Sequence, residues 1–371
     1  MPQRLVTATL VAALTAALTT AVAAGPASAS NDPRFNEQWN LTNVGAPAAW
    51  AAGATGVGVR IAIVDTGIDL NHEDLGGGKL VASTSCIGSD GDPARCTGSA
   101  QDDNGHGTHV AGIAAANKDN NKGVAGVAPD ASLVVVKVLA ADGSGNDADV
   151  VAGIKWAVDN GAKVVSLSLG DSFVITSLFG SSLRDGIDYA WARGAVTVLA
   201  AGNTNLLGLG SSNYGTLPAI VVGATDRNNR VTSYSSPLGT ARWAVMAPGG
   251  AGTANKADDV LSSFWEKGKP DAYRALAGTS MATPHVAGAV ALLLGQGLSP
   301  QAAVDRVLAT ANSAVSCGAG SPTCRGRLDV GKAVTGTTTP LTTPGPVPRT
   351  GLGGLGALLD LLGLRGLLPI G

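Results

Sequence analysis

Short runs of valine, isoleucine, leucine and alanine recur along the middle of this chain, and they constrain its fold more than any other feature. The runs are apolar on both faces, as are the strands of a parallel sheet that is covered on both sides. Segments of helical length stand between and after them. This alternation predicts an α/β fold in a single domain, with a doubly wound, mainly parallel sheet and helices on both faces. The expected strands are Val59–Val64, Leu133–Val138, Lys163–Leu169, Ala195–Ala200 and Ala219–Val222, and the expected helices are His106–Asn117, Asp147–Asn160, Ser181–Arg193 and Thr279–Leu294.

The charge of the chain argues against one large class of functions. The 371 residues contain 25 Lys and Arg against 27 Asp and Glu, a net charge of −2, so no basic surface for nucleic acid is predicted. Charged residues make up only 14% of the chain and glycine is abundant, which is typical of a compact globular protein with many tight turns.

Residues 1–29 have the pattern of a secretory signal. Arg4 precedes an apolar run over residues 5–24, and the small residues Ala27 and Ala29 follow, so we predict cleavage after Ala29. The run is nearly long enough to span a membrane, and a membrane anchor is the alternative. The helix-breaking pair Gly25-Pro26 favours a removed signal, and therefore a secreted, extracellular protein with no transmembrane span after the signal is removed.

The four cysteines form two local pairs. We predict the disulfides Cys86–Cys96 and Cys317–Cys324, because short-range pairs that close surface loops are the simplest of the three possible connectivities in an oxidising compartment. A metal site is the alternative, but neither a C-x-x-C spacing nor nearby histidines support it.

The composition changes after the globular part, which we place at residues 30–334. Residues 335–350 are rich in threonine and proline and are typical of an extended linker. Residues 351–371 are a tail rich in glycine and leucine, which is either flexible or contains a short amphipathic helix that binds a surface or a partner. The tail leucines with helical spacing are Leu355, Leu358, Leu359 and Leu362.

Three residues in the globular part are placed where chemistry is expected. Asp65 ends an apolar strand, and ligand sites of doubly wound sheets gather at the carboxyl ends of strands. His106 stands among glycines at the start of a predicted helix. Ser280 is at the start of another helix, where free N–H groups and the dipole stabilise negative charge. His285 lies five residues after Ser280, a rotation of about 140° around the helix, so the base that activates Ser280 must come from elsewhere. His106 can be that base and Asp65 the carboxylate that orients it.

The pair His106 and His109 also allows a different interpretation. The two residues are three apart, so they could share a helix face and bind a metal together with Asp102 or Asp103. The chain offers no third ligand with a convincing spacing, and the His-Glu-x-x-His pattern of metalloproteases is absent because Gly107 stands in place of the glutamate. We therefore favour the serine nucleophile.

The chain resembles the subtilisin family of serine proteases, and its thermitase-like members in particular, over roughly residues 31–334. The resemblance rests on IVDTG around Asp65, NGHGTHVAG around His106 and GTSMATPHVAG around Ser280, in this order. It implies that Asp65 orients the base, that His106 is general base and acid, and that Ser280 attacks the peptide carbonyl. It implies an endopeptidase that works on protein or peptide substrates without a catalytic cofactor. We expect activity at neutral to alkaline pH, since His106 must be neutral to accept a proton.

The resemblance assigns roles to further residues. Asn203, in the segment AAGN, is expected to donate into the oxyanion hole together with the backbone N–H of Ser280. The expected pocket walls are small and apolar, so we predict a preference for an apolar or aromatic residue before the cleaved bond. The expected substrate-binding residues are Gly143, Ser144 and Gly145 in an edge strand that pairs with the substrate, Ser168, Leu169 and Gly170 in one pocket wall, and Ala200, Ala201 and Gly202 in the other.

Structural roles follow from the same resemblance. His72 and His109 match histidines that are not catalytic. Asp32, Asp74 and Asn120 align with calcium ligands of relatives, so we expect a structural calcium ion. Residues 31–33 follow the expected cleavage site almost at once and resemble the start of a mature enzyme, so we expect no N-terminal processing beyond removal of the signal.

We expect the protein to be a monomer. A catalytically silent binding protein with this fold is one alternative function, and an esterase or transpeptidase that uses the same acyl-enzyme is another. The intact set of Asp65, His106, Ser280 and Asn203 disfavours the first of these.

Overall fold

The computed structural model of the chain describes residues 30–169, 182–203 and 214–336. The predicted signal at residues 1–29, the pocket residue Gly170 and the tail at residues 351–371 lie outside the described residues, as does most of the predicted linker.

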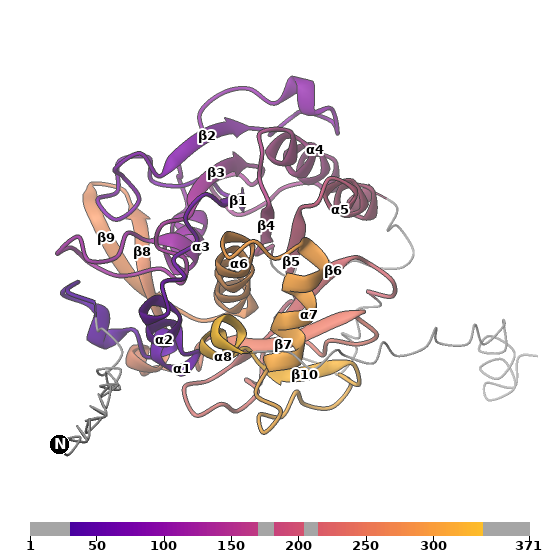
Figure 1. Ribbon diagram of the computed structural model, residues 1–371. Coiled ribbons are helices and arrows are strands. Elements are labelled where there is room, and N and C mark those ends of the chain that lie inside the picture. The colour runs from indigo at the N-terminus through magenta and orange to yellow at the C-terminus, as the bar shows by residue number, and fades with distance from the viewer. Residues whose placement is uncertain (1–29, 170–181, 204–213, 337–371) are drawn as a thin grey trace, which may run out of the picture. The chain divides into compact units, whose positions relative to one another are not determined.

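Within the described residues, eight strands form the central sheet, and every neighbouring pair is parallel (Figure 1). Their order is β10-β7-β6-β5-β4-β1-β3-β2. From β4 the chain builds outward to β10, whereas on the other side it goes from β1 to the edge strand β2 and returns to place β3 between them. This arrangement confirms the predicted doubly wound parallel sheet. The strands are β1 (Arg60–Asp65), β2 (Leu80–Ser85), β3 (Ser132–Lys137), β4 (Val164–Leu167), β5 (Val196–Ala200), β6 (Ala219–Thr225), β7 (Trp243–Pro248) and β10 (Cys324–Arg327).

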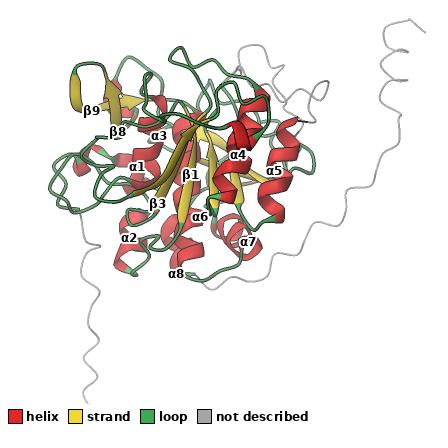
Figure 2. Cartoon of the chain, turned by 90° about the horizontal axis from the view of Figure 1, so that it is seen from above, coloured by secondary structure: helices red, strands yellow, loops and turns green. Residues whose placement is uncertain are grey.

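Helices cover both faces of the sheet (Figure 2). Alternate residues of the central strands enter different cores: Ile61 and Ile63 of β1 pack with α3 and α6, whereas Ala62 and Val64 pack with α4 and α5. This double burial explains why the strands are continuous apolar runs. The helices are α1 (Trp39–Asn43), α2 (Ala46–Ala51), α3 (His106–Ala115), α4 (Asp147–Asp159), α5 (Ser182–Ala192), α6 (Thr279–Gly295), α7 (Pro300–Thr310) and α8 (Val330–Thr335).

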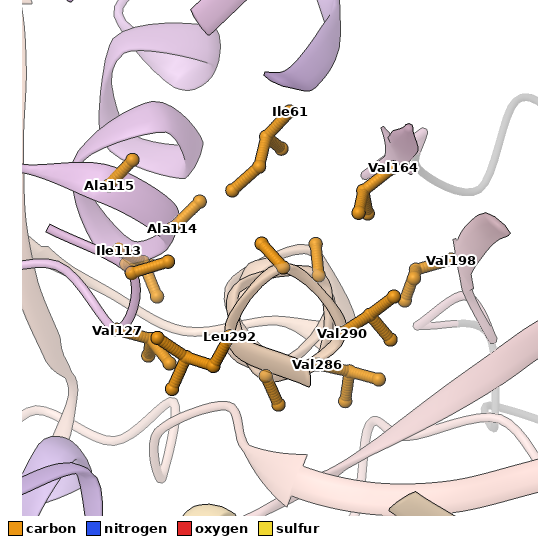
Figure 3. Packing of buried hydrophobic residues seen from close by; sticks show 14 of the residues in the cluster. Ile61, Ile113, Ala114, Ala115, Val127, Val164, Val198, Val286, Val290 and Leu292 are labelled. Atoms are coloured by element: carbon orange, nitrogen blue, oxygen red, sulfur yellow. The ribbon is translucent and has the colours of Figure 1, made fainter. Parts of the chain in front are cut away.

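The helix α6 lies in the middle of one core and is buried from Thr279 to Leu293. Its side chain Val290 lies toward Val198 of the sheet (Figure 3). A helix that is hydrophobic all round is stable only when it is enclosed in this way. The packing therefore fixes the N-terminal end of α6, where Ser280 is found.

An antiparallel hairpin of β8 (Val260–Glu266) and β9 (Lys269–Leu276) lies on α3, outside the main sheet (Figure 1). The hydroxyls of Ser262 and Ser263 donate to the carbonyl oxygens of His109 (2.9 Å) and Thr108 (3.0 Å) in α3. Because β9 leads directly into α6, the hairpin joins the starts of both helices.

All the expected strands and helices are present, with ends displaced by at most three residues. The prediction missed β2, β7, β10, the β8–β9 hairpin, and the helices α1, α2, α7 and α8. The strands β2 and β10 are the edges of the sheet and are partly polar; Val81 of β2, for example, is 45% exposed. Such strands lack the two-sided apolar signal. The β7 segment is apolar and fully buried, so the same criterion could have found it.

Both predicted disulfides, Cys86–Cys96 and Cys317–Cys324, are present. Within the described ranges, no helix combines the length and apolarity that a membrane span requires.

Candidate active site

The carboxyl ends of the central strands bring the predicted catalytic residues to one edge of the sheet. Asp65 is the last residue of β1, His106 is the first residue of α3, and Ser280 is the second residue of α6. This is the edge at which doubly wound sheets bind ligands.

Asp65 and His106 are joined directly. His106 Nδ1 lies 2.8 Å from Asp65 Oδ1, which also accepts the backbone N–H of Thr66 (2.7 Å). A Cβ at Gly107 would stand 2.0 Å from the Gly67 carbonyl oxygen, so only glycine lets α3 approach the end of β1 this closely. The hydrogen bond to Asp65 leaves Nε2 as the imidazole nitrogen that faces away from the carboxylate.

The environment of His106 favours its protonated form. Burial lowers the pKa of His106, but the charge and the hydrogen bond of Asp65, together with the charge of Asp102, outweigh burial and leave the pKa above its ordinary value. The side chain is 27% exposed, whereas that of Asp65 is 1% exposed. The imidazole is thus the accessible member of the pair.

Ser280 is held at the start of α6 by a reciprocal pair of bonds with Ser168. The Ser280 hydroxyl donates to the Ser168 carbonyl (3.1 Å), and the Ser168 hydroxyl donates to the Ser280 carbonyl (2.9 Å). Within the described part of the chain, Ser280 makes no hydrogen bond to His106, because its one hydroxyl proton is directed at Ser168. Catalytic hydrogen bonds are often misaligned in a free enzyme and form when substrate binds.

Asn203 lies just after β5 and beside the start of α6. Its Oδ1 accepts the backbone N–H of Thr279 (2.8 Å) and the Thr279 hydroxyl (3.1 Å). That hydroxyl in turn accepts the N–H of Gly202 (3.1 Å). These bonds orient the amide group of Asn203 next to Ser280.

The residues expected to bind substrate surround this edge. Ser168 and Leu169 follow β4, and Ala200, which ends β5, is followed by Ala201 and Gly202. All except Gly202 are buried, and none carries a charge.

The segment Gly143–Gly145, which is expected to pair with the substrate, is not a strand of the sheet in the free protein. Ala140 and Gly143 close a turn, in which the N–H of Gly143 donates to the Ala140 carbonyl (2.9 Å) and the N–H of Ala140 donates to the Ser144 carbonyl (2.8 Å). Gly143 has a φ of 81°, which favours glycine and is not a strand conformation. The segment is an exposed loop before α4.

Comparison with known proteins decides the family. A sequence model described as the Subtilase family matches residues 56–338, more than half of the chain. The chain is a subtilase. It is 40% identical to thermitase from Thermoactinomyces vulgaris over 307 residues, which cover 82% of this chain and 98% of thermitase. It is 42% identical to subtilisin Savinase from Lederbergia lenta over 260 residues, which cover 69% of this chain and 83% of that protein.

A solved structure agrees with this family. The subtilase matches a protease structure from Pseudoalteromonas arctica with a TM-score of 0.68 and 32% identity, over 83% of this chain and 99% of that chain. The subtilase is accordingly a serine-type endopeptidase that acts on peptide substrates, and such enzymes need no catalytic cofactor.

The other histidines of the subtilase are bound to the scaffold. His72 Nε2 lies 3.0 Å from the Ala272 carbonyl, and His109 Nε2 lies 2.8 Å from the Arg274 carbonyl. Burial lowers the pKa of His109 to about 3, so its ring is neutral. His285 Nδ1 lies 2.8 Å from the Met281 carbonyl, and its Nε2 lies 2.8 Å from Asn40 Nδ2. No group of three His, Cys, Asp or Glu side chains that could hold a metal occurs among the described residues.

The three residues expected to bind calcium come from separate segments that meet at the loop after α3. The oxygens of Asp32 accept the N–H groups of Asp119 (3.0 Å) and Asn120 (3.1 Å), and Asp74 Oδ1 accepts Asn120 Nδ2 (2.9 Å). Neither carboxylate forms an ion pair in the described part of the chain, and burial raises the pKa of Asp74. Two such carboxylates fit calcium, provided that Asn120 turns its amide oxygen toward the ion.

Sequence reasoning missed two residues that support the site. Asp102 was considered only as a metal ligand, but it is fully buried and binds the start of α3. Lys137, the last residue of β3, donates to the carbonyls of Thr66 (2.9 Å) and Leu139 (2.8 Å) and to Asp103 (2.7 Å). A lysine at the end of an otherwise apolar strand is the signal that could have revealed the second residue.

Proposed function

We propose that this subtilase cleaves peptide bonds through an acyl-enzyme on Ser280, with His106 as general base and acid and Asp65 as the residue that orients His106. The observation that carries the proposal is the 2.8 Å contact between His106 Nδ1 and buried Asp65, at the same sheet edge as the N-terminal end of α6. This arrangement supplies each part of a serine-nucleophile site.

In the first half of the reaction, Ser280 Oγ forms a bond to the substrate carbonyl carbon while its proton moves to His106 Nε2. To do so, the hydroxyl leaves its hydrogen bond to Ser168. The tetrahedral oxyanion accepts hydrogen bonds from the Ser280 N–H and Asn203 Nδ2. The C–N bond then breaks, and the departing amine takes the proton from His106.

In the second half, water attacks the ester carbonyl of the acyl-enzyme and gives its proton to His106. The carboxyl product leaves, and the proton returns to Ser280. The negative charge of Asp65 favours the imidazolium in both halves and keeps Nδ1 protonated, so that Nε2 is the atom that exchanges protons with Ser280.

We propose a preference for an apolar or aromatic residue before the cleaved bond. The small walls Ser168–Leu169 and Ala200–Gly202 support this, since a charged substrate side chain would meet no opposite charge there. Peptide anilides that differ only in having Phe, Lys or Glu at this position test it. The kcat/KM should be highest for Phe, and a preference for Lys or Glu would refute the proposed pocket.

We further propose that residues 1–29 are removed on export, that residues 335–350 link the catalytic domain to the tail, and that Asp32, Asp74 and Asn120 hold a structural calcium ion. Support for export comes from the pattern of residues 1–29 and from the two disulfides. The N-terminal sequence of the secreted protein tests the first point, with Ser30 expected as the first residue.

Casein hydrolysis tests the roles of the three residues. Ser280→Ala and His106→Ala should each lower kcat by about 10⁴-fold or more, and Asp65→Asn by a similar factor. Ser83→Ala, an exposed serine on the edge strand β2, is the matched control and should keep wild-type activity. Hydrolysis that survives Ser280→Ala would refute the proposal.

A further inference from the structure

Asp102 stands behind the proposed catalytic residues and is fully buried. Its Oδ1 accepts the N–H groups of Asn104 (3.0 Å) and Gly105 (2.9 Å) and the hydroxyl of Thr66 (2.9 Å). Its Oδ2 accepts the N–H (3.0 Å) and the hydroxyl (2.5 Å) of Thr108. All five partners donate, so the carboxyl must be ionised to accept every bond.

The two threonine hydroxyls connect Asp102 to both halves of the Asp65–His106 pair. Thr66 follows Asp65, and its hydroxyl accepts the N–H of Gly107 (2.9 Å) while it donates to Asp102. The hydroxyl of Thr108 accepts the N–H of Asp69 (2.8 Å) while it donates to Asp102. Each hydroxyl thus joins the segment after β1 to the first turn of α3. We call Asp102 and these two threonines the Asp102 clamp.

Asp102 also leaves one negative charge near His106 that is not neutralised. Charged or titratable side chains on the elements that pack against α3 include Asp65 on β1, Lys137 on β3, Glu266 on β8 and His285 on α6. Asp103 precedes α3, His109 lies on it, and Arg274 is on β9. Lys137 pairs with Asp103, and Arg274 pairs with Glu266. His109 is neutral. Among the described residues, the charges that raise the pKa of His106 are those of Asp65 and Asp102, and both favour an imidazolium.

We propose that Asp102 is a positioning residue for the reaction: the Asp102 clamp holds Asp65 and His106 at bonding distance, and its buried charge stabilises the imidazolium that forms when Ser280 gives up its proton. This inference rests on the proposed function, because it assigns the general base to His106. Asp102 touches no substrate and acts through His106.

The pH profile of Asp102→Asn tests the proposal. Asparagine keeps the shape of the side chain but loses its charge. Its amide has a single acceptor oxygen, so it cannot accept the N–H groups of Asn104 and Gly105 on one side and the N–H of Thr108 on the other. The kcat should fall by about 10- to 100-fold with KM within about twofold, because a small displacement of His106 slows the chemistry without changing the pocket walls. The acid limb of kcat/KM, which reports the pKa of His106 in the free enzyme, should move down by about 0.5 to 1 pH unit.

Asp149→Asn is the matched control. Asp149 is also buried, and it accepts the N–H groups of Gly88, Ser89 and Asp90 and the side chains of Ser89 and Asn146. It does not act on His106, so its loss should lower Tm without moving the acid limb. An acid limb that coincides in Asp102→Asn and wild type would overturn the proposal, whatever the change in kcat, since Asp102 would then be only a helix cap.

Two further variants keep the test decisive. If Asp102→Asn yields no folded protein, Thr66→Val and Thr108→Val are measured instead; each keeps the charge of Asp102. The proposal predicts a lower kcat at constant KM, and an unchanged kcat in both variants overturns it. His106→Ala separates this inference from the proposed function. If His106→Ala retains activity, the proposed function fails, whereas loss of activity with no effect of Asp102 refutes only the clamp.

Discussion

Buried His285 makes the stability of this subtilase depend on pH. The side chain is fully buried in α6, where Nδ1 donates to the Met281 carbonyl (2.8 Å) and Nε2 accepts Asn40 Nδ2 (2.8 Å). A protonated ring has no acceptor, so it cannot keep both bonds. Burial lowers the pKa of His285 from 6.5 to about 4.

The sign and size of the effect follow from these two values. As the pH falls below 6.5, the unfolded chain takes up a proton at this residue and the folded protein does not, so stability is lost between about pH 6.5 and pH 4. At pH 5 the free energy of unfolding is lower by about 2 kcal/mol. This loss depends mainly on the pKa of His285 in the unfolded chain, because the ring in the folded protein is still neutral at pH 5. His109 adds a similar loss. The raised pKa of His106 acts in the opposite direction, since its contribution to stability is present at low pH and is lost as the pH rises through the folded pKa.

Urea unfolding at pH 7.5 and pH 5 measures this effect, with Ser280→Ala as background to prevent self-digestion. The change in the free energy of unfolding between the two pH values should be about 2 kcal/mol smaller in His285→Gln, because the variant lacks the titrating ring while His109 and His106 remain. The comparison of two pH values removes any constant loss of stability in the variant. An equal change in both proteins would refute the argument that His285 is neutral in the folded state.

Three further predictions concern residues around the site. Asn203→Ala should lower kcat by about 10²–10³-fold with little change in KM, the range known for oxyanion-hole donors; steady-state kinetics on a peptide anilide checks this. A calcium chelator should lower the Tm of the wild type but not that of Asp74→Asn, and equal shifts would count against the proposed site. Lys137→Met should lower the free energy of unfolding by about 2–3 kcal/mol, because it removes a donor from the buried carbonyls of Thr66 and Leu139. Urea unfolding measures it, and a change below about 0.5 kcal/mol would contradict it.

The interior of the fold could be predicted because it depends on local patterns. The strands β1, β3, β4, β5 and β6 are buried on both faces, so their runs are unmistakably apolar. The edge strands and the β8–β9 hairpin are stabilised by contacts with distant residues, such as the bonds of Ser262 and Ser263 to α3. Serines in a strand carry no local signal of that packing.

The part of the active site that lies within the three sequence motifs could be predicted. Asp65 and His106 are in contact as expected, and the three motifs together identified the family. The support from Asp102 could not be deduced, because two hydroxyls from different motifs converge on it only in the folded chain. The turn at Gly143–Gly145 could not be foreseen from the expected pairing with substrate, because that pairing forms only with a bound peptide.

The most direct test of the account is to identify the nucleophile chemically. The purified protein is treated with a fluorophosphonate, digested and analysed by mass spectrometry. We expect one modified peptide, with the phosphonyl group on Ser280, and loss of that modification in His106→Ala as well as in Ser280→Ala. Modification of a different residue, or unchanged modification of Ser280 in His106→Ala, would contradict the assignment of Ser280 as a nucleophile that His106 activates.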